Sequence, residues 1–484
     1  MHFVVKLFPE ITIKSAPVRK RMTKQLRNNL RKLLQSLDAD IRVEMDWEKI
    51  EITGPENDEL TMQMADVLAR TPGIANFSQV QHFALGDFDD ILEKTLSVWS
   101  DRLDGKTFVL RVKRSGKHDF TSHDVERQVG GGLLHQSAAV GVKLKNPDIT
   151  VRLEIRHDQL YVVEDTTSGL GGFPLGSQDS VISLISGGFD STVSSYLTVK
   201  RGLRTHYLFF NLGGRAHEVG VKEVAFYLWN KFGSSHRVRF ISVPFEEVVS
   251  EILCNVHNSQ MGVVLKRMML RAAERIADEM SVQGLVTGES VAQVSSQTLA
   301  NLSVIDSVTN TLVLRPLVTF DKNDIIDIAR KIGTEEFAAN MPEYCGVISV
   351  KPTTRAKEER VVREESAFDF DVLERAIANK WVQNIDEVMQ DAEPLARVEV
   401  FAMPQPGTVI VDIRHPDEVD VRPLKEGESV VQEVPFFTLQ NRLKELDDGT
   451  QYLLYCDKGV MSRLHAELLV EQGFANVAVY RPTK

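Results

Sequence analysis

The sequence predicts a multidomain protein of the α/β and α+β classes, centred on a doubly wound parallel sheet. The chain has 484 residues, which is too long for a single hydrophobic core. Between residues 175 and 390, short apolar β-prone runs alternate with helical segments, a rhythm typical of a parallel sheet. Hydrophobic residues make up 43% of the chain and charged residues 26%, the composition of a globular protein.

Two small modules of mixed helices and strands precede this sheet, at residues 1–60 and 61–165. In the first module we expect a strand at 3–7, a basic helix at 18–37 and further strands at 41–52. In the second module we expect a sheet with helices around it. Its strands are predicted at 78–83, 107–113 and 149–155, with a helix at 88–103 and a glycine turn at 130–132. A glycine-rich stretch at 166–176 predicts a linker.

Basic side chains gather in these two modules although the whole chain has a net charge of −11. That net charge argues against a protein that coats nucleic acid with its entire surface, whereas a basic N-terminal half suits contact with a phosphate backbone. A solvated basic surface is the alternative interpretation. The candidate RNA-binding residues are Lys14, Arg19, Lys20, Arg111, Lys113, Arg114 and Lys117.

The third segment, residues 177–395, predicts the parallel sheet itself. Its strands are expected at 181–185, 204–211, 238–243 and 284–287, and its helices at 192–201, 219–232 and 261–280. The charged stretch from 355 to 393 is expected to be helical. Ligands of such sheets bind at the carboxyl ends of the strands.

A Ser-Gly-Gly-Phe-Asp-Ser string follows the first of these strands, from Ser186 to Ser191. Glycines between a strand and a helix let backbone N–H groups converge on an anion, where a Cβ would block phosphate. No lysine follows the glycines, so the string is not a Walker loop. It resembles the PP-loop of the N-type ATP pyrophosphatases, which implies that ATP is cleaved to AMP and pyrophosphate. A strand-to-helix turn without a ligand is the alternative.

The last segment, residues 404–484, predicts a compact α/β domain with a thiol at a strand end. Cys456 ends the strand 452–456, and a glycine-containing loop leads into a helix from 462. Converging N–H groups and a helix N-terminus favour a thiolate there, and Lys458 and Arg463 would add to this. A cysteine phosphatase would need arginine where Ser462 stands. The segment resembles a single-domain rhodanese, which implies a cysteine persulfide.

The order of the four modules resembles the tRNA 4-thiouridine synthetase (tRNA sulfurtransferase) family in its long form with a rhodanese domain. The resemblance implies a ferredoxin-like domain at 1–60, a THUMP RNA-binding domain at 61–165, an adenylating PP-loop domain at 177–395 and a rhodanese domain at 404–484. It implies that ATP adenylates O4 of the tRNA uridine at position eight and that persulfide sulfur then displaces AMP, giving 4-thiouridine. It also implies sulfur transfer toward the thiazole of thiamine.

The resemblance further implies roles for individual residues. Cys456 would carry the persulfide, Cys345 would form a transient disulfide with it, and Asp190 and Lys322 would be catalytic. Cys254 matches no motif of the family and is expected to be partly buried. The residues implied to bind ATP are Leu184, Ile185, Ser186, Gly187, Gly188, Asp190, Ser191, Lys266, Gly288 and Gln297.

The implied cofactors are ATP and the Mg²⁺ that accompanies it, and no dedicated metal site is expected. The implied partners are tRNA, a cysteine desulfurase that donates sulfur, the sulfur-carrier protein of thiazole synthesis and a second copy of the chain. With no long apolar run and no signal peptide at the N-terminus, we expect a cytoplasmic protein that does not contact a membrane. Two alternatives stay open: another ligase or amidating enzyme of the pyrophosphatase class, and an RNA-binding protein with a redox-sensing thiol.

Overall fold

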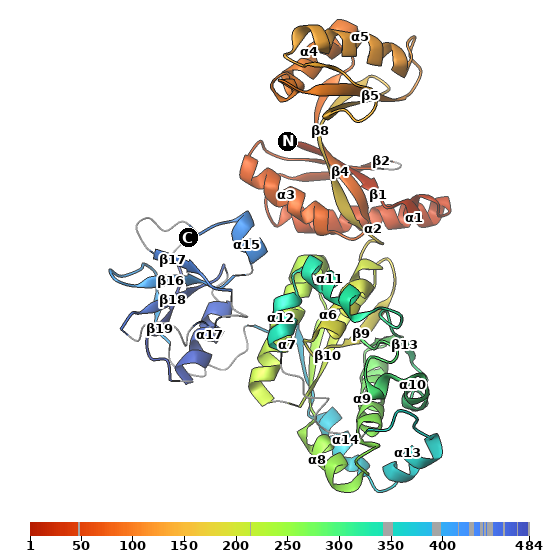
Figure 1. Cartoon of the computed structure of the whole chain (residues 1–484), viewed down its shortest axis with the longest axis vertical. Coiled ribbons are helices and arrows are strands. Elements are labelled where there is room, and N and C mark those ends of the chain that lie inside the picture. Colours follow the sequence, from red (N-terminus) through yellow and green to blue (C-terminus); the bar gives the residue numbers. More distant parts are fainter. Residues whose placement is uncertain are drawn as a thin grey trace. The chain divides into compact units, whose positions relative to one another are not determined.

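The computed structural model separates into two compact units, Met1–Ser177 with Lys200–Gly202, and Gln178–Val199 with Leu203–Lys484 (Figure 1). The structure describes residues 1–46, 49–212, 214–341, 352–389, 398–414, 416–424, 430–435, 439, 442, 449–457, 460–471 and 473–482. Within these residues, no helix is both long and apolar enough to cross a membrane.

The first unit is built on one long mixed sheet with the strand order β2-β3-β1-β4-β8-β7-β5-β6. Strands β4 and β8 pair antiparallel along nearly their whole length, from Ile74 opposite Gly171 to Ala84 opposite Gln159. The strands are β1 (His2–Leu7), β2 (Arg42–Asp46), β3 (Lys49–Thr53), β4 (Ile74–Ala84), β5 (Thr107–Ser115), β6 (Gly141–Val142), β7 (Ile149–Arg156) and β8 (Gln159–Gly171). The predicted strands of both modules therefore belong to a common sheet.

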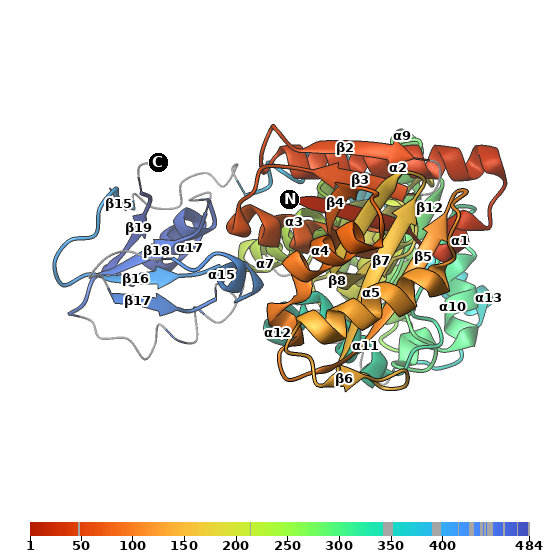
Figure 2. The same ribbon diagram turned by 90° about the horizontal axis from the view of Figure 1, so that it is seen from above.

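Helices cover this sheet through apolar stripes. The basic helix α2 buries Leu26, Leu30 and Leu34, spaced four residues apart on one face, and leaves its charged face exposed. Figure 2 shows α4 and α5 lying across β5 and β7. The helices are α1 (Pro9–Thr12), α2 (Ala16–Gln35), α3 (Asp58–Arg70), α4 (Phe88–Trp99) and α5 (Ser122–Gln136).

Two details of the sequence prediction differ here. The glycine turn expected at 130–132 is wrong, because these residues lie inside α5, which a capping box between Thr121 and Asp124 begins. A Cβ on Gly132 would lie 2.3 Å from Leu92 Cδ2, so this glycine permits close packing of α5 on α4. The expected linker at 166–176 also differs, since β8 continues through its first half to Gly171.

The second unit contains the predicted doubly wound sheet, with the strand order β13-β12-β9-β10-β11-β14. All neighbouring strands are parallel except β14, which pairs antiparallel with β11 at one edge. The sequence interpretation assigned only helix to the region that contains β14. The strands are β9 (Ser180–Leu184), β10 (Arg204–Asn211), β11 (Arg239–Pro244), β12 (Gly284–Val286), β13 (Leu312–Leu314) and β14 (Trp381–Asn384).

Helix α9 (Met261–Glu279) packs in the main hydrophobic core of this unit and buries Val264, Met268 and Ala272. A buried ion pair between Arg267 and Glu365, 2.6 Å long, joins it to α13. The other helices around this sheet are α6 (Phe189–Lys200), α7 (Gly214–Leu228), α8 (Glu246–Asn255), α10 (Leu299–Asp306), α11 (Lys322–Ile332), α12 (Glu335–Asn340), α13 (Glu358–Glu365) and α14 (Phe370–Ala378).

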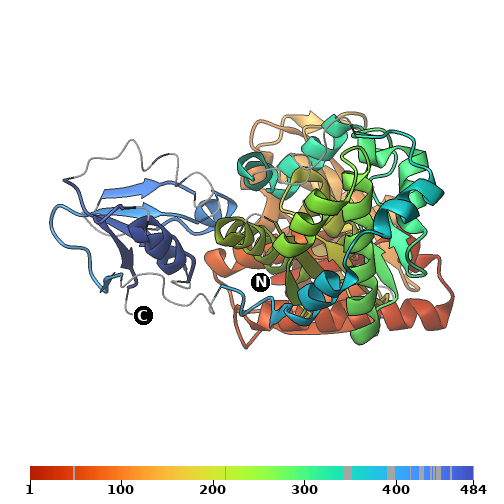
Figure 3. The same cartoon turned by 90° about the horizontal axis from the view of Figure 1, so that it is seen from below.

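The C-terminal residues form a smaller parallel sheet with the order β15-β19-β18-β16-β17. Seen from below in Figure 3, the dark-blue helix α17 (Val460–Glu471) lies on one face of it. The remaining elements are β15 (Val400–Phe401), β16 (Val409–Asp412), α15 (Pro416–Val421), β17 (Val430–Glu433), β18 (Tyr452–Tyr455) and β19 (Val477–Tyr480). The strand predicted at 452–456 and the helix predicted after it are confirmed as β18 and α17.

Candidate functional site

The loop between β9 and α6 is closed by its own two serine hydroxyls. Ser191 Oγ accepts a hydrogen bond from the Ser186 backbone N–H at 3.2 Å and lies 3.2 Å from Ser186 Oγ. Ser191 Oγ also donates to the Gly188 carbonyl at 3.2 Å. The strand end Leu184 and Ile185 leads directly into this turn. The hydrogen bonds shape the loop around the N-terminus of α6, the geometry that anions occupy.

Two glycines allow close approaches at this loop. Gly187 has φ +83°, and a Cβ there would lie 2.4 Å from Met341 Cε. Gly288 follows β12, and its Cβ would lie 2.6 Å from the backbone carbon of Asp190. The loop after β12 therefore touches the backbone of the serine loop, as neighbouring parallel strands require at their carboxyl ends.

The Asp190 carboxylate is held by two side chains from distant parts of the chain. Lys322 Nζ lies 2.9 Å and 3.1 Å from its two oxygens, and Gln293 Nε2 donates to it at 3.0 Å. Helix α6 begins at Phe189, three residues before the predicted start, so Asp190 lies in its first turn. The structure thus brings Asp190 and Lys322 together, as the sequence analysis expected.

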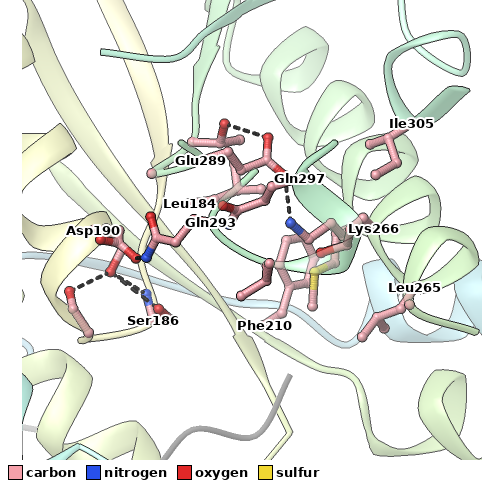
Figure 4. A pocket seen from close by; sticks show the side chains of 18 of the residues that line it. Leu184, Ser186, Asp190, Phe210, Leu265, Lys266, Glu289, Gln293, Gln297 and Ile305 are labelled. Carbon is pink, nitrogen blue, oxygen red and sulfur yellow. Dashed lines mark hydrogen bonds and ion pairs between the residues drawn. The ribbon is translucent and has the colours of Figure 1, made fainter. Parts of the chain in front are cut away.

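A cavity of about 680 Å³ opens beside this loop (Figure 4). One end is polar and formed by Ser186 and Asp190, whereas Phe210, Leu265 and Ile305 line an apolar end. Among the residues implied to bind ATP, those that line the cavity are Leu184, Ile185, Ser186, Gly188, Asp190, Ser191, Lys266, Gly288 and Gln297. Gly187 lies in the loop but is not among the lining residues. The volume and the mixed lining suit a ligand of nucleotide size.

A buried carboxylate in the cavity wall, Glu289, escaped the sequence analysis. Its two oxygens accept from Lys266 Nζ at 2.6 Å and from Arg315 Nε at 2.8 Å, and Thr287 Oγ1 donates to it at 3.0 Å. Burial alone would raise the pKa of Glu289, but Lys266 and Arg315 outweigh burial and lower it. Glu289 is therefore a charged carboxylate between two cations.

Gln293 and His217 are further lining residues that sequence reasoning missed. His217 Nε2 lies 3.4 Å from the Ser186 carbonyl oxygen, and burial lowers the pKa of its imidazole. The available signal for Glu289 and Gln293 was their position in the loop that follows β12, at a carboxyl strand end. His217 lies near the start of α7, the helix that follows β10, and carried the same signal.

The thiol of Cys456 faces the first turn of α17. It is 8% exposed, and its Sγ accepts a hydrogen bond from the Ser462 backbone N–H at 3.3 Å. Ser462 Oγ is 3.5 Å from the same sulfur. The expected position of the thiol at a helix N-terminus is thus present, and α17 begins at Val460, two residues earlier than predicted. Lys458 lies outside the described residues.

A network of charges fixes the start of this loop. Arg414 is 4% exposed, forms a two-pronged ion pair with Asp412 and reaches Asp457 at 3.1 Å. Burial alone would lower the pKa of the Arg414 guanidinium, but its hydrogen bonds to Asp412 and the nearby carboxylates raise it. Arg422 also pairs with Asp457. The residue that follows the thiol is therefore held by two arginines.

The remaining candidates are less closely grouped. Cys345 lies outside the described residues. Cys254 is exposed on α8, whereas the sequence analysis expected partial burial. The basic candidates Lys14, Arg19 and Lys20 lie around α1 and α2, and Arg111, Lys113, Arg114 and Lys117 lie on β5 and just after it. Three strands separate β1, which leads into α1, from β5 in the sheet order.

The described residues contain no group of three or more His, Cys, Asp or Glu side chains that could hold a metal ion. In the cavity, Asp190 at the polar end is a carboxylate that a magnesium ion brought with a nucleotide could use. Glu289 already has two cationic partners.

Four family models match the chain in succession. They describe the ThiI ferredoxin-like domain (residues 2–78), the THUMP domain (86–165), the thiamine biosynthesis protein ThiI (176–370) and a rhodanese-like domain (399–481). Together they give the fold class that the sequence predicted: ferredoxin-like, THUMP, PP-loop and rhodanese domains.

Proteins similar to the chain include curated relatives and a solved structure. The tRNA sulfurtransferases of Saccharophagus degradans and Azotobacter vinelandii are 58% and 55% identical to it, and each match covers 100% of both chains. The structure of a 4-thiouridine synthetase–RNA complex with bound ATP matches 79% of this chain and 99% of its own, with 26% identity and a TM-score of 0.71. By this full-length identity and the four successive domain matches, the chain belongs to the tRNA sulfurtransferase (ThiI) family of enzymes.

Proposed function

We propose that this protein transfers persulfide sulfur to O4-activated uridine at position eight of tRNA and so produces 4-thiouridine. The observation that carries the proposal is the presence, in one chain, of a nucleotide-sized cavity on a glycine-serine loop and a thiol at a helix N-terminus. The first suits activation by ATP, and the second suits a sulfur nucleophile. The relatives named tRNA sulfurtransferase and the 4-thiouridine synthetase–RNA complex with bound ATP support this choice of reaction.

In the first step, uridine O4 attacks the α-phosphorus of ATP. The new bond joins O4 to that phosphorus, and pyrophosphate leaves with the electrons of the broken P–O bond. Ser186, Gly187, Gly188 and Ser191 would surround the phosphates. The two serines bond within the loop and set its shape, and the backbone N–H groups at the start of α6 would be the donors. Lys322, beside Asp190, would offset the negative charge that develops on the phosphate, and Mg²⁺ would enter with ATP.

In the second step, the terminal sulfur of a Cys456 persulfide attacks C4 of the uracil. The C4–O4 bond breaks, AMP leaves with O4, and sulfur bridges Cys456 and C4. The thiolate of Cys345 then attacks the Cys456 sulfur, which releases 4-thiouridine and leaves a Cys345–Cys456 disulfide. A thiol reductant must reduce this disulfide, and a cysteine desulfurase must reload the persulfide.

The basic residues of the first unit would bind the RNA. We include Lys14, Arg19 and Lys20 around α2, and Arg111, Lys113, Arg114 and Lys117 at β5. A second copy of the chain would take part in tRNA binding. The same persulfide would serve thiazole synthesis through its sulfur-carrier protein. We place these events in the cytoplasm, where tRNA and desulfurase are available.

One reconstitution tests the proposal. Protein, ATP, Mg²⁺, unmodified tRNA, cysteine desulfurase, cysteine and a thiol reductant are incubated, and 4-thiouridine is measured by its absorbance after nucleoside digestion. Wild type should form 4-thiouridine. Asp190→Ala should form no 4-thiouridine, although its Cys456 still gains a persulfide. Cys456→Ser should form neither the persulfide nor 4-thiouridine. Full thiolation by Cys456→Ser would overturn the proposal, and so would its absence with wild type.

The other two candidate functions predict different outcomes. An amidating enzyme of the same superfamily would adenylate its substrate with ATP and use ammonia to displace AMP, and would not need Cys456. If the chain were a non-catalytic RNA-binding protein, wild type and Asp190→Ala would bind tRNA equally well, and neither would consume ATP.

A further inference from the structure

Lys266 reaches the cavity on a long side chain whose position is set by a carboxylate. Its ammonium lies 2.6 Å from Glu289 Oε1, and Figure 4 places this pair on the side of the cavity away from Ser186 and Asp190. An ammonium has three donors, and within the described part of the chain Glu289 accepts one of them. The other donors are available to a bound nucleotide.

Glu289 forms a second ion pair, with Arg315, on the side away from the cavity. Arg315 donates its Nε to Glu289 Oε2 at 2.8 Å and directs both terminal nitrogens to Asp306, at 2.8 Å and 2.6 Å. Arg315 and Asp306 are not among the residues that line the cavity. Four charges of alternating sign thus run from the cavity to the partly exposed Asp306: Lys266, Glu289, Arg315 and Asp306.

Secondary structure explains why these groups meet. Glu289 follows β12 and Arg315 follows β13, and these neighbouring strands are parallel, so their carboxyl ends lie side by side. Lys266 projects from α9 and Asp306 is the last residue of α10, and these two helices pack against each other. Lys266 from α9 and Arg315 from the end of β13 therefore meet at Glu289, which is 8% exposed.

We propose that Glu289 is a positioning residue for nucleotide binding: it holds the Lys266 ammonium at the cavity wall and is fixed by Arg315. This inference rests on the proposed use of ATP and adds the group through which Lys266 acts. A free lysine side chain samples many rotamers, and a charge-assisted hydrogen bond to a rigid carboxylate removes that freedom before the ligand arrives.

The test is a double-mutant cycle on the affinity for ATP, measured by calorimetry on the full chain. Lys266→Met should weaken ATP binding, and Glu289→Gln should weaken it by roughly tenfold. In the Lys266→Met background, Glu289→Gln should cause no further loss, because its effect passes through Lys266. The KM for ATP should rise in Glu289→Gln while the KM for tRNA stays unchanged, a split that general structural damage would not produce.

Glu274→Gln is the matched control. Glu274 lies on the same helix α9 and accepts hydrogen bonds from Thr309 and Asn310, but it does not line the cavity. Its substitution should leave ATP affinity at the wild-type value. If Glu289→Gln does not fold, Arg315→Lys takes its place in the cycle, because it keeps the charge and loses the fork that reaches Asp306.

The inference would be overturned if Glu289→Gln reduced ATP affinity by the same factor in the wild-type and Lys266→Met backgrounds. Unchanged or tighter ATP binding by Glu289→Gln would also overturn it. Unchanged ATP binding by Lys266→Met would instead contradict the proposed nucleotide contact of Lys266. The two failures are therefore distinguishable.

Discussion

Gly288 illustrates how one residue can set the shape of the cavity. A Cβ at this position would lie 2.6 Å from the Asp190 carbonyl carbon and 2.8 Å from the Ser191 nitrogen. These are backbone atoms and cannot rotate away as the end of a side chain would. The approach of two strand ends therefore depends on the absence of a side chain here.

Gly288→Ala should accordingly displace the serine loop and weaken ATP binding by roughly fivefold or more, because overpacking costs ~1–3 kcal/mol and ~1.4 kcal/mol corresponds to tenfold in affinity. Calorimetric titration with ATP measures this. Gly141→Ala is the control, because nothing lies within 4 Å of the Cβ it would add. ATP affinity that is the same in Gly288→Ala and wild type would show that the loop tolerates the added methyl group.

Some residues of the candidate site could be predicted from the sequence and others could not. Ser186, Gly188 and Asp190 stand in a short string whose spacing has a chemical meaning, and they were predicted to act together. Glu289 and Arg315 are 26 positions apart, and only the pairing of β12 with β13 brings them within 2.8 Å. No local pattern encodes that contact.

At the scale of elements, strand β10 contains a histidine that pairing with β11 keeps neutral. His206 Nδ1 accepts the backbone N–H of Arg239 at 2.9 Å. Burial, together with the charges of Arg204 and Arg239, lowers the pKa of His206 to about 4. The unfolded chain has the ordinary pKa of about 6.5 and so binds this proton more readily than the folded chain.

The stability supplied by neutral His206 should therefore be complete above pH 6.5 and fall as the pH drops toward 4. Between pH 7 and pH 5 the expected loss in the free energy of unfolding is on the order of 1–2 kcal/mol. His206→Gln should lack this part of the pH dependence in denaturant unfolding at the two pH values. The same substitution at the exposed His257 should leave the dependence unchanged, and equal slopes for wild type and His206→Gln would refute the assignment.

The elements that the sequence predicted well are those with a clear apolar period. The helix α2 and the strands β9 to β12 fall within a few residues of their expected bounds. Burial of one face gives α2 its apolar period, and burial of both faces makes each strand a continuous apolar run. The turn predicted at the triple glycine in α5 is wrong, and the close packing of Gly132 on Leu92, which requires a small residue within the helix, has no signal in the local sequence. Strand β14 was missed because its residues Trp381 and Val382 are exposed and show no burial pattern of their own.

At the scale of the whole molecule, the order of modules was more informative than any one motif. An anion-binding loop alone fits many ATP-dependent reactions, and a cysteine at a helix N-terminus alone fits several thiol chemistries. Their combination with basic N-terminal modules made thiolation of RNA the leading prediction, with an amidating enzyme and a non-catalytic RNA-binding protein as alternatives. Sequence could not supply the ion-pair network behind Lys266, because it depends on elements spread across more than fifty residues.

The central claim is that ATP activates the oxygen that sulfur replaces, and isotope transfer tests it most directly. A tRNA with ¹⁸O at O4 of the target uridine is thiolated by the wild-type protein, and the AMP formed is analysed by mass spectrometry. If O4 bonds to the α-phosphorus and leaves with it, as we propose, the AMP should contain one ¹⁸O for each 4-thiouridine produced. Unlabelled AMP accompanied by 4-thiouridine would contradict the account.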